Sequence, residues 1–302
     1  MDINKVTAVY FVGAGGIGMS ALIRYFLAKG KRVGGYDKTP SDLTEELKKE
    51  GADIHYEDNV ALIGEAFKSP DDTLVVYTPA VPESHTELTY FRAHGFEVMK
   101  RARVLGEITK SSRGLCVAGT HGKTTTSSML ASVLDAMGED PTFLIGGIVR
   151  SYGTNAHSGQ GRHYVVEADE SDKSFTYLSP RAVLVTNIEA DHLDHYRDLD
   201  EIYEKFASFI GSVPDDGGVV VACGEDEALV RVARASGKRL FTYGFSDACD
   251  VRIASYEPNG VGSDFTLELP DGSVVSAHVK QNPGRHNVLN AAGVVGLLWA
   301  LG

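Results

Sequence analysis

A segment rich in glycine and threonine, near the middle of the chain, is the sequence feature that most constrains the fold. It consists of Gly119, Thr120, His121, Gly122, Lys123, Thr124 and Thr125. Residues 115–118 before it form an apolar run typical of a buried strand, and residues 126–137 after it have the periodicity of a helix. A strand, a glycine turn and a helix in this order predict an α/β fold built on a parallel sheet.

The same segment predicts a phosphate-binding loop. Backbone N–H groups and the positive end of the helix would hold phosphate oxygens. Lys123 would reach the β- and γ-phosphates, and the hydroxyl of Thr124 would ligate Mg²⁺. The common pattern has a glycine where this chain has Val117, so we expect a shorter loop. A glycine turn before an ordinary helix is the alternative, but it does not explain a lysine placed between glycine and hydroxyl side chains.

A second glycine-rich loop follows the apolar run at residues 6–12, and residues 19–29 after it predict a helix. Its spacing fits G-x-G-x-x-G, and Asp37 ends the next predicted strand at 32–36. This context is typical of dinucleotide binding. The motif alone is weakly specific, because any diphosphate can bind at such a helix start. Asp37 is either a ligand of a ribose or base, or a solvated residue at a strand end.

Strands and helices alternate along the chain, and two domains are predicted. Residues 1–107 predict a Rossmann-like parallel-sheet domain, and residues 108–302 predict a P-loop α/β ATPase domain. Residues 250–280 differ, because short alternating runs separated by Asn-Gly and Asp-Gly turns predict a small antiparallel β insertion. Residues 287–301 predict a final apolar helix.

The composition narrows the classes of partner. The 302 residues carry a net charge of −12, which argues against a nucleic-acid or membrane-surface partner. No apolar run approaches the ~18–20 residues of a membrane span, and the N-terminus lacks a signal-peptide pattern, so we expect a cytoplasmic protein. Cys116, Cys223 and Cys249 lie far apart, which predicts neither a disulfide framework nor a CxxC metal site.

Acidic residues lie at the end of a predicted strand at residues 164–167 and directly after it. They are Glu167, Asp169, Glu170 and Asp172, and the carboxyl ends of parallel strands face the ligand crevice. Acids in this position, beside a phosphate loop, would hold Mg²⁺, and their mutual repulsion requires a cation or solvent between them. An acidic surface turn is the alternative.

Two further pairs of side chains are candidates for binding. His192 and His195 follow the next predicted strand, and a helix would bring them to the same side. Taken alone they favour a zinc or dimetal hydrolase site, whereas structural histidines are the alternative. Asn287 and Asn290 would share a face of the last helix, where amides can pair with the edge of an adenine. Helix capping by Asn287 is the alternative for that residue.

Together these motifs resemble the Mur ligase family. The resemblance rests on residues 13–20 (GAGGIGMS), 119–126 (GTHGKTTT), 167–172 (EADESD), 186–192 (TNIEADH) and 284–290 (GRHNVLN). The motifs occur in this order along essentially the whole chain. The first is weakly specific, whereas the second, third and fourth in combination are highly specific.

The resemblance implies an ATP-dependent ligase of peptidoglycan precursor synthesis, which joins L-alanine to UDP-N-acetylmuramate through an acyl phosphate. By position it implies that Lys123, Glu167 and His192 are catalytic. It also implies that Thr124, Glu167 and His192 hold Mg²⁺. ATP would bind residues 119–125 and, through its adenine, Asn287 and Asn290. Residues 171–175 would approach the substrate. The UDP sugar, rather than NAD, would bind the first loop and its neighbours: Gly13, Ala14, Gly15, Gly16, Ile17, Gly18, Asp37 and Thr78.

Several alternatives remain open. The family has a third, C-terminal domain that supplies the amino-acid site, and the resemblance does not include it, so we expect these 302 residues alone to turn over little substrate. A family member that recycles murein tripeptide uses the same sugar nucleotide. Outside the family, the alternatives are an NAD-dependent dehydrogenase, a non-catalytic nucleotide-binding regulator and a zinc hydrolase.

Overall fold

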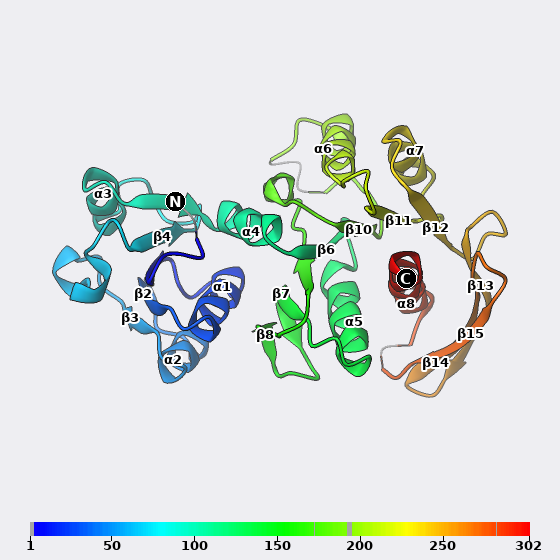
Figure 1. Ribbon diagram of the computed structural model, residues 1–302, viewed down its shortest axis with the longest axis horizontal. Helices are drawn as coiled ribbons and strands as arrows, with labels where there is room; N and C mark the ends of the chain where they lie inside the picture. The colour runs from blue at the N-terminus through cyan, green and yellow to red at the C-terminus, as the bar shows by residue number, and fades with distance from the viewer. Residues whose placement is uncertain (1–2, 172, 192–194, 282) are drawn as a thin grey trace. The chain divides into compact units, whose positions relative to one another are not determined.

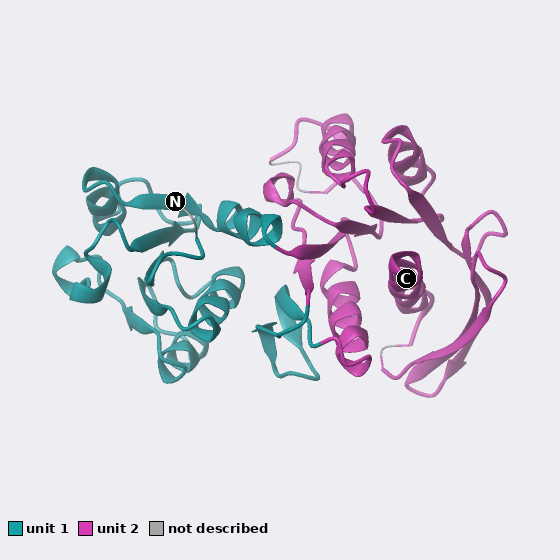
Figure 2. Ribbon diagram, viewed as in Figure 1, with its two compact units in different colours: residues 1–111, 140–161 teal, residues 112–139, 162–302 magenta. Residues whose placement is uncertain are grey.

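The structure, a computed structural model, describes residues 3–171, 173–191, 195–281 and 283–302 (Figure 1). Contacts divide the chain into two compact units, shown in Figure 2. Unit 1 comprises residues 1–111 and 140–161, and unit 2 comprises residues 112–139 and 162–302. The predicted domain boundary between residues 107 and 108 stays a prediction. The chain leaves unit 1 after residue 111 and returns to it with residues 140–161.

Unit 1 is built on a parallel sheet with the strand order β3-β2-β1-β4-β5. Its strands are β1 Ala8–Val12, β2 Arg32–Tyr36, β3 Asp53–His55, β4 Thr73–Tyr77 and β5 Glu97–Lys100. Its helices are α1 Ile17–Ala28, α2 Asp42–Lys49, α3 Thr86–Ala93 and α4 Arg101–Lys110, with short 3-10 turns η1 Val60–Leu62 and η2 Glu65–Phe67. Strands β1 and β4 are buried along their whole length, as expected for parallel strands covered on both faces. The predicted Rossmann-like sheet is confirmed.

An antiparallel hairpin, which the sequence did not predict, completes unit 1. It consists of β7 Thr142–Val149 and β8 Thr154–His157, and both strands contact α1. Alternation of apolar and polar side chains is weak in this segment, which contains Gly146, Gly147 and Gly153. The missing alternation explains why no strand was predicted there.

Unit 2 contains strands in the order β15-β14-β13-β12-β11-β10-β6-β9. They are β6 Arg113–Ala118, β9 His163–Glu167, β10 Ala182–Val185, β11 Val219–Cys223, β12 Leu240–Gly244, β13 Val251–Asn259, β14 Gly262–Glu268 and β15 Val274–Val279. The helices are α5 Lys123–Ala136, α6 Leu199–Gly211, α7 Glu227–Ala235 and α8 Arg285–Leu301, with the 3-10 turn η3 Ser174–Tyr177. Pairing is parallel from β9 to β13 and antiparallel from β13 to β15, which confirms the predicted antiparallel segment.

The middle of this sheet positions the candidate site. Strand β6 lies between β9 and β10 and is parallel to both, so the carboxyl ends of the three strands meet at one edge. The phosphate loop follows β6, the acidic segment follows β9, and Thr186 follows β10. Among the described residues, no helix is long and apolar enough to cross a membrane.

Candidate nucleotide-binding sites

The phosphate loop of unit 2 connects β6 to α5. Helix α5 begins at Lys123, earlier than the predicted start at residue 126, so the lysine and both following threonines belong to its first turn. Gly119 and Gly122 take φ values of +135° and +85°, which side chains rarely adopt. A Cβ on Gly119 would also lie 2.1 Å from Oγ1 of Thr186. Both glycines are therefore required for the loop to pass close to the end of β10.

Lys123 is anchored in the loop by several oxygen atoms. Its Nζ donates to the carbonyl oxygens of Gly119 (2.6 Å) and Thr120 (3.0 Å). The same ammonium lies 2.9 Å and 2.8 Å from the two carboxylate oxygens of Glu170, which is 2% exposed. Burial raises the pKa of Glu170, and the charge of Lys123 opposes that shift. The lysine therefore places a positive charge at the start of α5, balanced by a buried carboxylate.

The two predicted metal ligands that the structure describes lie together. Oγ1 of Thr124 donates to Oε1 of Glu167 over 2.9 Å. A hydroxyl and a carboxylate oxygen at this separation are the hard oxygen ligands that Mg²⁺ prefers. His192, the third predicted ligand, lies outside the described residues, as does Asp172. Among the residues that are described, no group of three or more His, Cys, Asp or Glu side chains could hold a metal.

The three described acids of residues 167–172, Glu167, Asp169 and Glu170, do not form one cluster of equivalent groups. Glu167 contacts Thr124, whereas Glu170 pairs with Lys123. Asp169 accepts a hydrogen bond from the backbone N–H of Ser171 over 3.0 Å. A purely solvated acidic turn is therefore wrong for the described acids, because two of them bind side chains of the phosphate loop.

Sequence reasoning missed how the segment after β10 holds the phosphate loop. Oδ1 of Asn187 accepts from the backbone N–H of His121 (2.8 Å), and its Nδ2 donates to the carbonyl of His121 (3.1 Å). Oγ1 of Thr186 donates to that same carbonyl over 2.6 Å. The sequence predicts a binding function for this segment only through its histidines. The sequence signal for these contacts with the phosphate loop is that the segment directly follows a predicted strand.

The two asparagines of α8 contact each other, as their spacing predicted, and Asn290 lies beside the phosphate loop. A Cβ on Gly122 would lie 3.0 Å from Oδ1 of Asn290, and Nδ2 of Asn290 donates to Oδ1 of Asn287 over 3.4 Å. Their exposed fractions are 8% and 5%. Helix α8 is capped at Gly284, so the alternative that Asn287 caps the helix is wrong.

The segment predicted to approach the substrate, 171–175, carries a lysine held by α6. Nζ of Lys173 lies 2.6 Å from Oε1 of Glu201. A hydrogen bond from the backbone N–H of Arg197, followed by the contact with Lys173, lowers the pKa of Glu201 to about 2. Lys173 takes a positive φ of 64°. The contact of this segment with a substrate stays a prediction.

The glycine loop of unit 1 connects β1 to α1. A Cβ on Gly13 would lie 2.4 Å from Cγ2 of Thr78, so the predicted residues Gly13 and Thr78 adjoin. Oδ2 of Asp37 accepts from the backbone N–H of Gly15 over 2.6 Å, and Oδ1 accepts from Thr39 N–H over 3.1 Å. Asp37 is therefore not simply solvated, because its carboxylate fixes the loop.

Arg101 is a candidate that sequence reasoning missed. It is the first residue of α4 and follows β5 directly. A Cβ on Gly18 would lie 2.8 Å from its Nη1, so the guanidinium lies against the first turn of α1. The available signal is that Arg101 directly follows strand β5, because the carboxyl ends of parallel strands face the ligand crevice.

Comparison with known proteins gives matches that include both loops. Residues 8–113 match the Mur ligase family, catalytic domain, and residues 117–298 match the Mur ligase middle domain. The UDP-N-acetylmuramate–L-alanine ligase of Parabacteroides distasonis is 57% identical over 311 residues, which cover 100% of this chain and 65% of that protein. The chain therefore spans about two thirds of the length of this relative.

Solved structures agree with the sequence comparison. The UDP-N-acetylmuramate-alanine ligase of Thermotoga maritima matches with a TM-score of 0.83 and 29% identity, over 98% of this chain and 65% of that one. The UDP-N-acetylmuramate:L-alanyl-γ-D-glutamyl-meso-diaminopimelate ligase of Neisseria meningitides matches with a TM-score of 0.85 and 26% identity, over 98% and 94%. The phosphate loop with its lysine, the carboxylates beside it and the matched residues lead to one conclusion: the chain belongs to the Mur ligase family.

Proposed function

We propose that this chain forms the nucleotide-binding part of a ligase that joins L-alanine to UDP-N-acetylmuramate at the expense of ATP, in peptidoglycan precursor synthesis and in the cytoplasm. The reaction would transfer the γ-phosphoryl group of ATP to the muramate carboxylate. The alanine amine would then attack the acyl phosphate and release phosphate. The observation that carries the proposal is the pairing of Lys123 with Glu170 and of Thr124 with Glu167 at one edge of the unit 2 sheet.

The phosphate loop of unit 2 would bind ATP. Phosphoryl transfer depends mainly on alignment and on neutralising charge, so the protein needs well-placed cations and N–H donors. Lys123 already lies at the start of α5, held by Glu170 and two loop carbonyls. On binding, we expect its ammonium to contact the β- and γ-phosphates while Glu170 keeps it oriented. Asn287 and Asn290 would pair with the adenine.

Thr124 and Glu167 fit a magnesium site, because their oxygen atoms lie within 2.9 Å of each other beside the loop. We propose that these two residues hold Mg²⁺ and that His192 contributes to a second metal position. When bound, the ion supplies positive charge that offsets the negative charge of the phosphate oxygens. In this site the carboxylate of Glu167 would orient the hydroxyl of Thr124.

The glycine loop of unit 1 would bind the diphosphate of the UDP sugar. The N-terminus of α1 offers backbone N–H groups to an anion, and the guanidinium of Arg101 adds a positive charge beside Gly18. Asp37 would shape the loop rather than bind the ribose, because its carboxylate is bound to backbone N–H groups. Arg101 thus joins the loop residues and Thr78 in the proposed site.

Isothermal titration calorimetry with the 302-residue chain tests the proposal. We expect separate binding of UDP-N-acetylmuramate and of ATP with Mg²⁺, and no binding of NADH. Binding of NADH without UDP-N-acetylmuramate would favour a dehydrogenase, and binding of ATP alone would favour a nucleotide-binding regulator. Adding L-alanine to both ligands and measuring phosphate release tests the prediction that these residues alone turn over little substrate.

A second candidate is the ligase that recycles murein peptides. It is favoured by the Neisseria meningitides structure, whose name gives a peptide as the amine substrate and which this chain matches over 94% of its length. Both candidates use the same sugar nucleotide, so the two sites described above serve either one. Comparing L-alanine with L-alanyl-γ-D-glutamyl-meso-diaminopimelate as amine substrate of the active protein decides between them.

A further inference from the structure

The sequence match and the contacts assign the hairpin of β7 and β8 to different parts of the chain. Its residues fall within the match to the Mur ligase middle domain at 117–298. Its contacts nevertheless place residues 140–161 in unit 1, where both strands touch α1 (Figure 2). Helix α1 begins directly after the glycine loop proposed to bind the sugar nucleotide.

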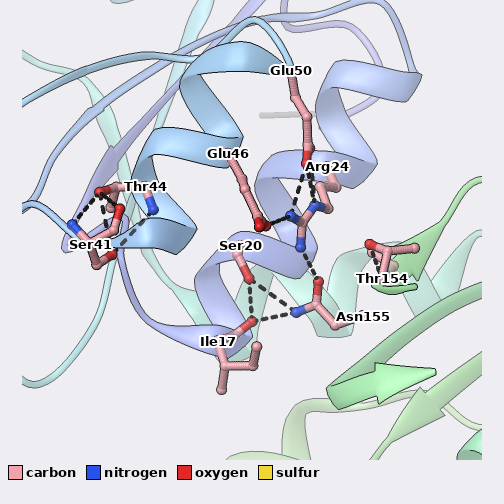
Figure 3. A network of polar contacts seen from close by, with 10 residues as sticks. Ile17, Ser20, Arg24, Ser41, Thr44, Glu46, Glu50, Thr154 and Asn155 are labelled. Atoms are coloured by element: carbon pink, nitrogen blue, oxygen red, sulfur yellow. Dashed lines mark hydrogen bonds and ion pairs between the residues drawn. The ribbon is translucent and has the colours of Figure 1, made fainter. Parts of the chain in front are cut away.

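A single buried side chain, that of Asn155, makes the polar contacts between this hairpin and α1 that Figure 3 shows. Its Nδ2 donates to the carbonyl of Ile17 over 2.7 Å and to Oγ of Ser20 over 3.0 Å. Its Oδ1 accepts from Nη1 of Arg24 over 2.7 Å. Asn155 is 0% exposed, and the partners come from the first two turns of one helix. The carboxamide therefore fixes where these turns lie.

Arg24 is itself held in place on the side away from Asn155. Its Nε lies 3.0 Å from both carboxylate oxygens of Glu50, and its Nη2 lies 3.4 Å from Oε2 of Glu46 (Figure 3). The side chain of Arg24 is 10% exposed. A fixed guanidinium orients the amide of Asn155, since only its oxygen can accept from Arg24. The nitrogen then has to face Ile17 and Ser20.

The contacts of Asn155 reach the turn of α1 that carries the anion-binding N–H groups. Ile17 is the first helical residue, and Oγ of Ser20 also donates to its carbonyl over 2.8 Å. The backbone N–H of Ser20 donates to the carbonyl of Gly16 in the glycine loop over 2.9 Å. A shift of this turn would move the N–H groups and the dipole that the diphosphate is proposed to use.

We propose that Asn155 is a positioning residue of the sugar-nucleotide site, which holds the first turn of α1 in the orientation that binds the diphosphate. The inference rests on the proposed function of the unit 1 loop. A merely structural role would lower the stability of the protein and leave the affinity of the folded chain unchanged. A positioning role lowers the affinity for the sugar nucleotide while the affinity for ATP stays the same.

Calorimetric titration of Asn155→Ala with UDP-N-acetylmuramate, and separately with ATP and Mg²⁺, distinguishes these roles. We expect about tenfold weaker binding of the sugar nucleotide, which corresponds to ~1.4 kcal/mol, and ATP binding within twofold of the wild type. Thr154→Ala is the matched control, because Thr154 precedes Asn155 in β8, and within the described part of the chain its hydroxyl makes only a long hydrogen bond of 3.5 Å, accepted from Ala156 N–H. It should bind both ligands like the wild type.

Unchanged affinity of folded Asn155→Ala for the sugar nucleotide would overturn the inference, and so would equal weakening of both ligands. If circular dichroism shows that this variant does not fold, Ser20→Ala replaces it, because it removes one acceptor of the same amide. About threefold weaker sugar-nucleotide binding by Ser20→Ala with unchanged ATP binding would support the inference, and unchanged binding of both would overturn it. A wild-type chain that does not bind UDP-N-acetylmuramate would instead refute the proposed function of the loop, and this inference with it.

Discussion

The two glycine loops of this chain have the same backbone plan but obtain their charges differently. Each follows a buried parallel strand and begins a helix. In unit 2 the cation, Lys123, belongs to the loop itself and is held by a buried carboxylate. In unit 1 the cation beside the loop, Arg101, comes from α4, and the nearby carboxylate of Asp37 binds backbone N–H groups.

The difference fits the two kinds of phosphate ligand that we propose for the loops. Carboxylates beside a lysine and a threonine hydroxyl suit a triphosphate that arrives with a metal ion, as in unit 2. A helix N-terminus with a guanidinium suits a diphosphate that needs no metal, because the fork of N–H donors fits phosphate oxygens directly. The same strand-loop-helix unit can therefore serve a reacting phosphate or a merely anchoring one, depending on which side chains surround it.

The largest expected effect is that of Lys123→Ala. It removes the only positive charge of residues 119–125 and leaves the carboxylate of Glu170, 2% exposed, without its ammonium partner. We expect ATP binding weakened at least 100-fold, or by ~2.7 kcal/mol, with unchanged binding of UDP-N-acetylmuramate. Calorimetry with each ligand measures both effects. Equal losses for the two ligands would contradict the separation of the two loops.

The converse experiment is Arg101→Ala in unit 1. A charge-assisted hydrogen bond to an ionised group contributes ~1.5–3 kcal/mol, so we expect UDP-N-acetylmuramate to bind at least tenfold more weakly. ATP should bind as it does to the wild type. Arg103→Ala is the matched control, since Arg103 is an exposed residue of the same helix. A variant at Arg101 that binds the sugar nucleotide normally would remove this residue from the site.

A smaller effect is expected on the concentration of Mg²⁺ that ATP binding requires. Thr124→Ala removes the hydroxyl that lies 2.9 Å from Glu167, whereas Thr124→Ser keeps a hydroxyl there. We expect the alanine variant to need about fivefold more Mg²⁺ for half-maximal ATP binding, which corresponds to ~1 kcal/mol. The serine variant should resemble the wild type. Binding of the sugar nucleotide should not depend on Mg²⁺ in any of the three proteins, and such a dependence would contradict the comparison.

The last expected effect is on stability rather than on ligand binding, and it concerns the two units as a function of pH. Burial raises the pKa of Glu87 in unit 1 from 4.5 to about 7, and the hydroxyl of Tyr10 donates to its Oε2 over 2.8 Å. Because the folded state binds this proton more tightly, the resulting stabilisation is complete below pH 4.5 and is lost as the pH rises through about 7. Glu87→Gln should lack this loss.

Hydrogen exchange of the unit 1 strands at pH 5 and pH 8, in the wild type and in Glu87→Gln, measures this difference. Trp299, the single tryptophan, lies in α8 of unit 2, so its fluorescence follows the other unit. We expect the pH-dependent difference between the two proteins in unit 1 exchange and not in tryptophan fluorescence. Parallel pH profiles of the wild type and the variant in unit 1 would contradict the role of Glu87.

The sequence predicted the elements with strong local patterns. Strand β2 has the predicted bounds, each glycine loop follows its predicted strand, and Asn287 and Asn290 contact each other on α8, as their spacing indicated. Their signals are local, because apolar runs and glycines at positive φ depend little on distant residues. The family resemblance, and with it the α/β fold, is confirmed by the matches over residues 8–113 and 117–298.

The remaining features depend on contacts between segments distant in sequence. The β7–β8 hairpin lacks alternation, and its association with α1 depends on Asn155, which contacts residues more than 130 positions earlier. Pairing of Glu170 with Lys123 spans 47 positions, and the place of Arg101 against Gly18 depends on sheet order. Patterns within a short window contain no information about such contacts.

Calorimetric titration of the 302-residue chain with one nucleotide in the presence of saturating amounts of the other tests the central claim most directly. The account predicts that the chain binds one UDP-N-acetylmuramate and one ATP with Mg²⁺ at the same time, and that neither ligand displaces the other. Displacement of one by the other, or binding of both ligands lost through Lys123→Ala alone, would contradict the claim that each glycine loop holds its own nucleotide.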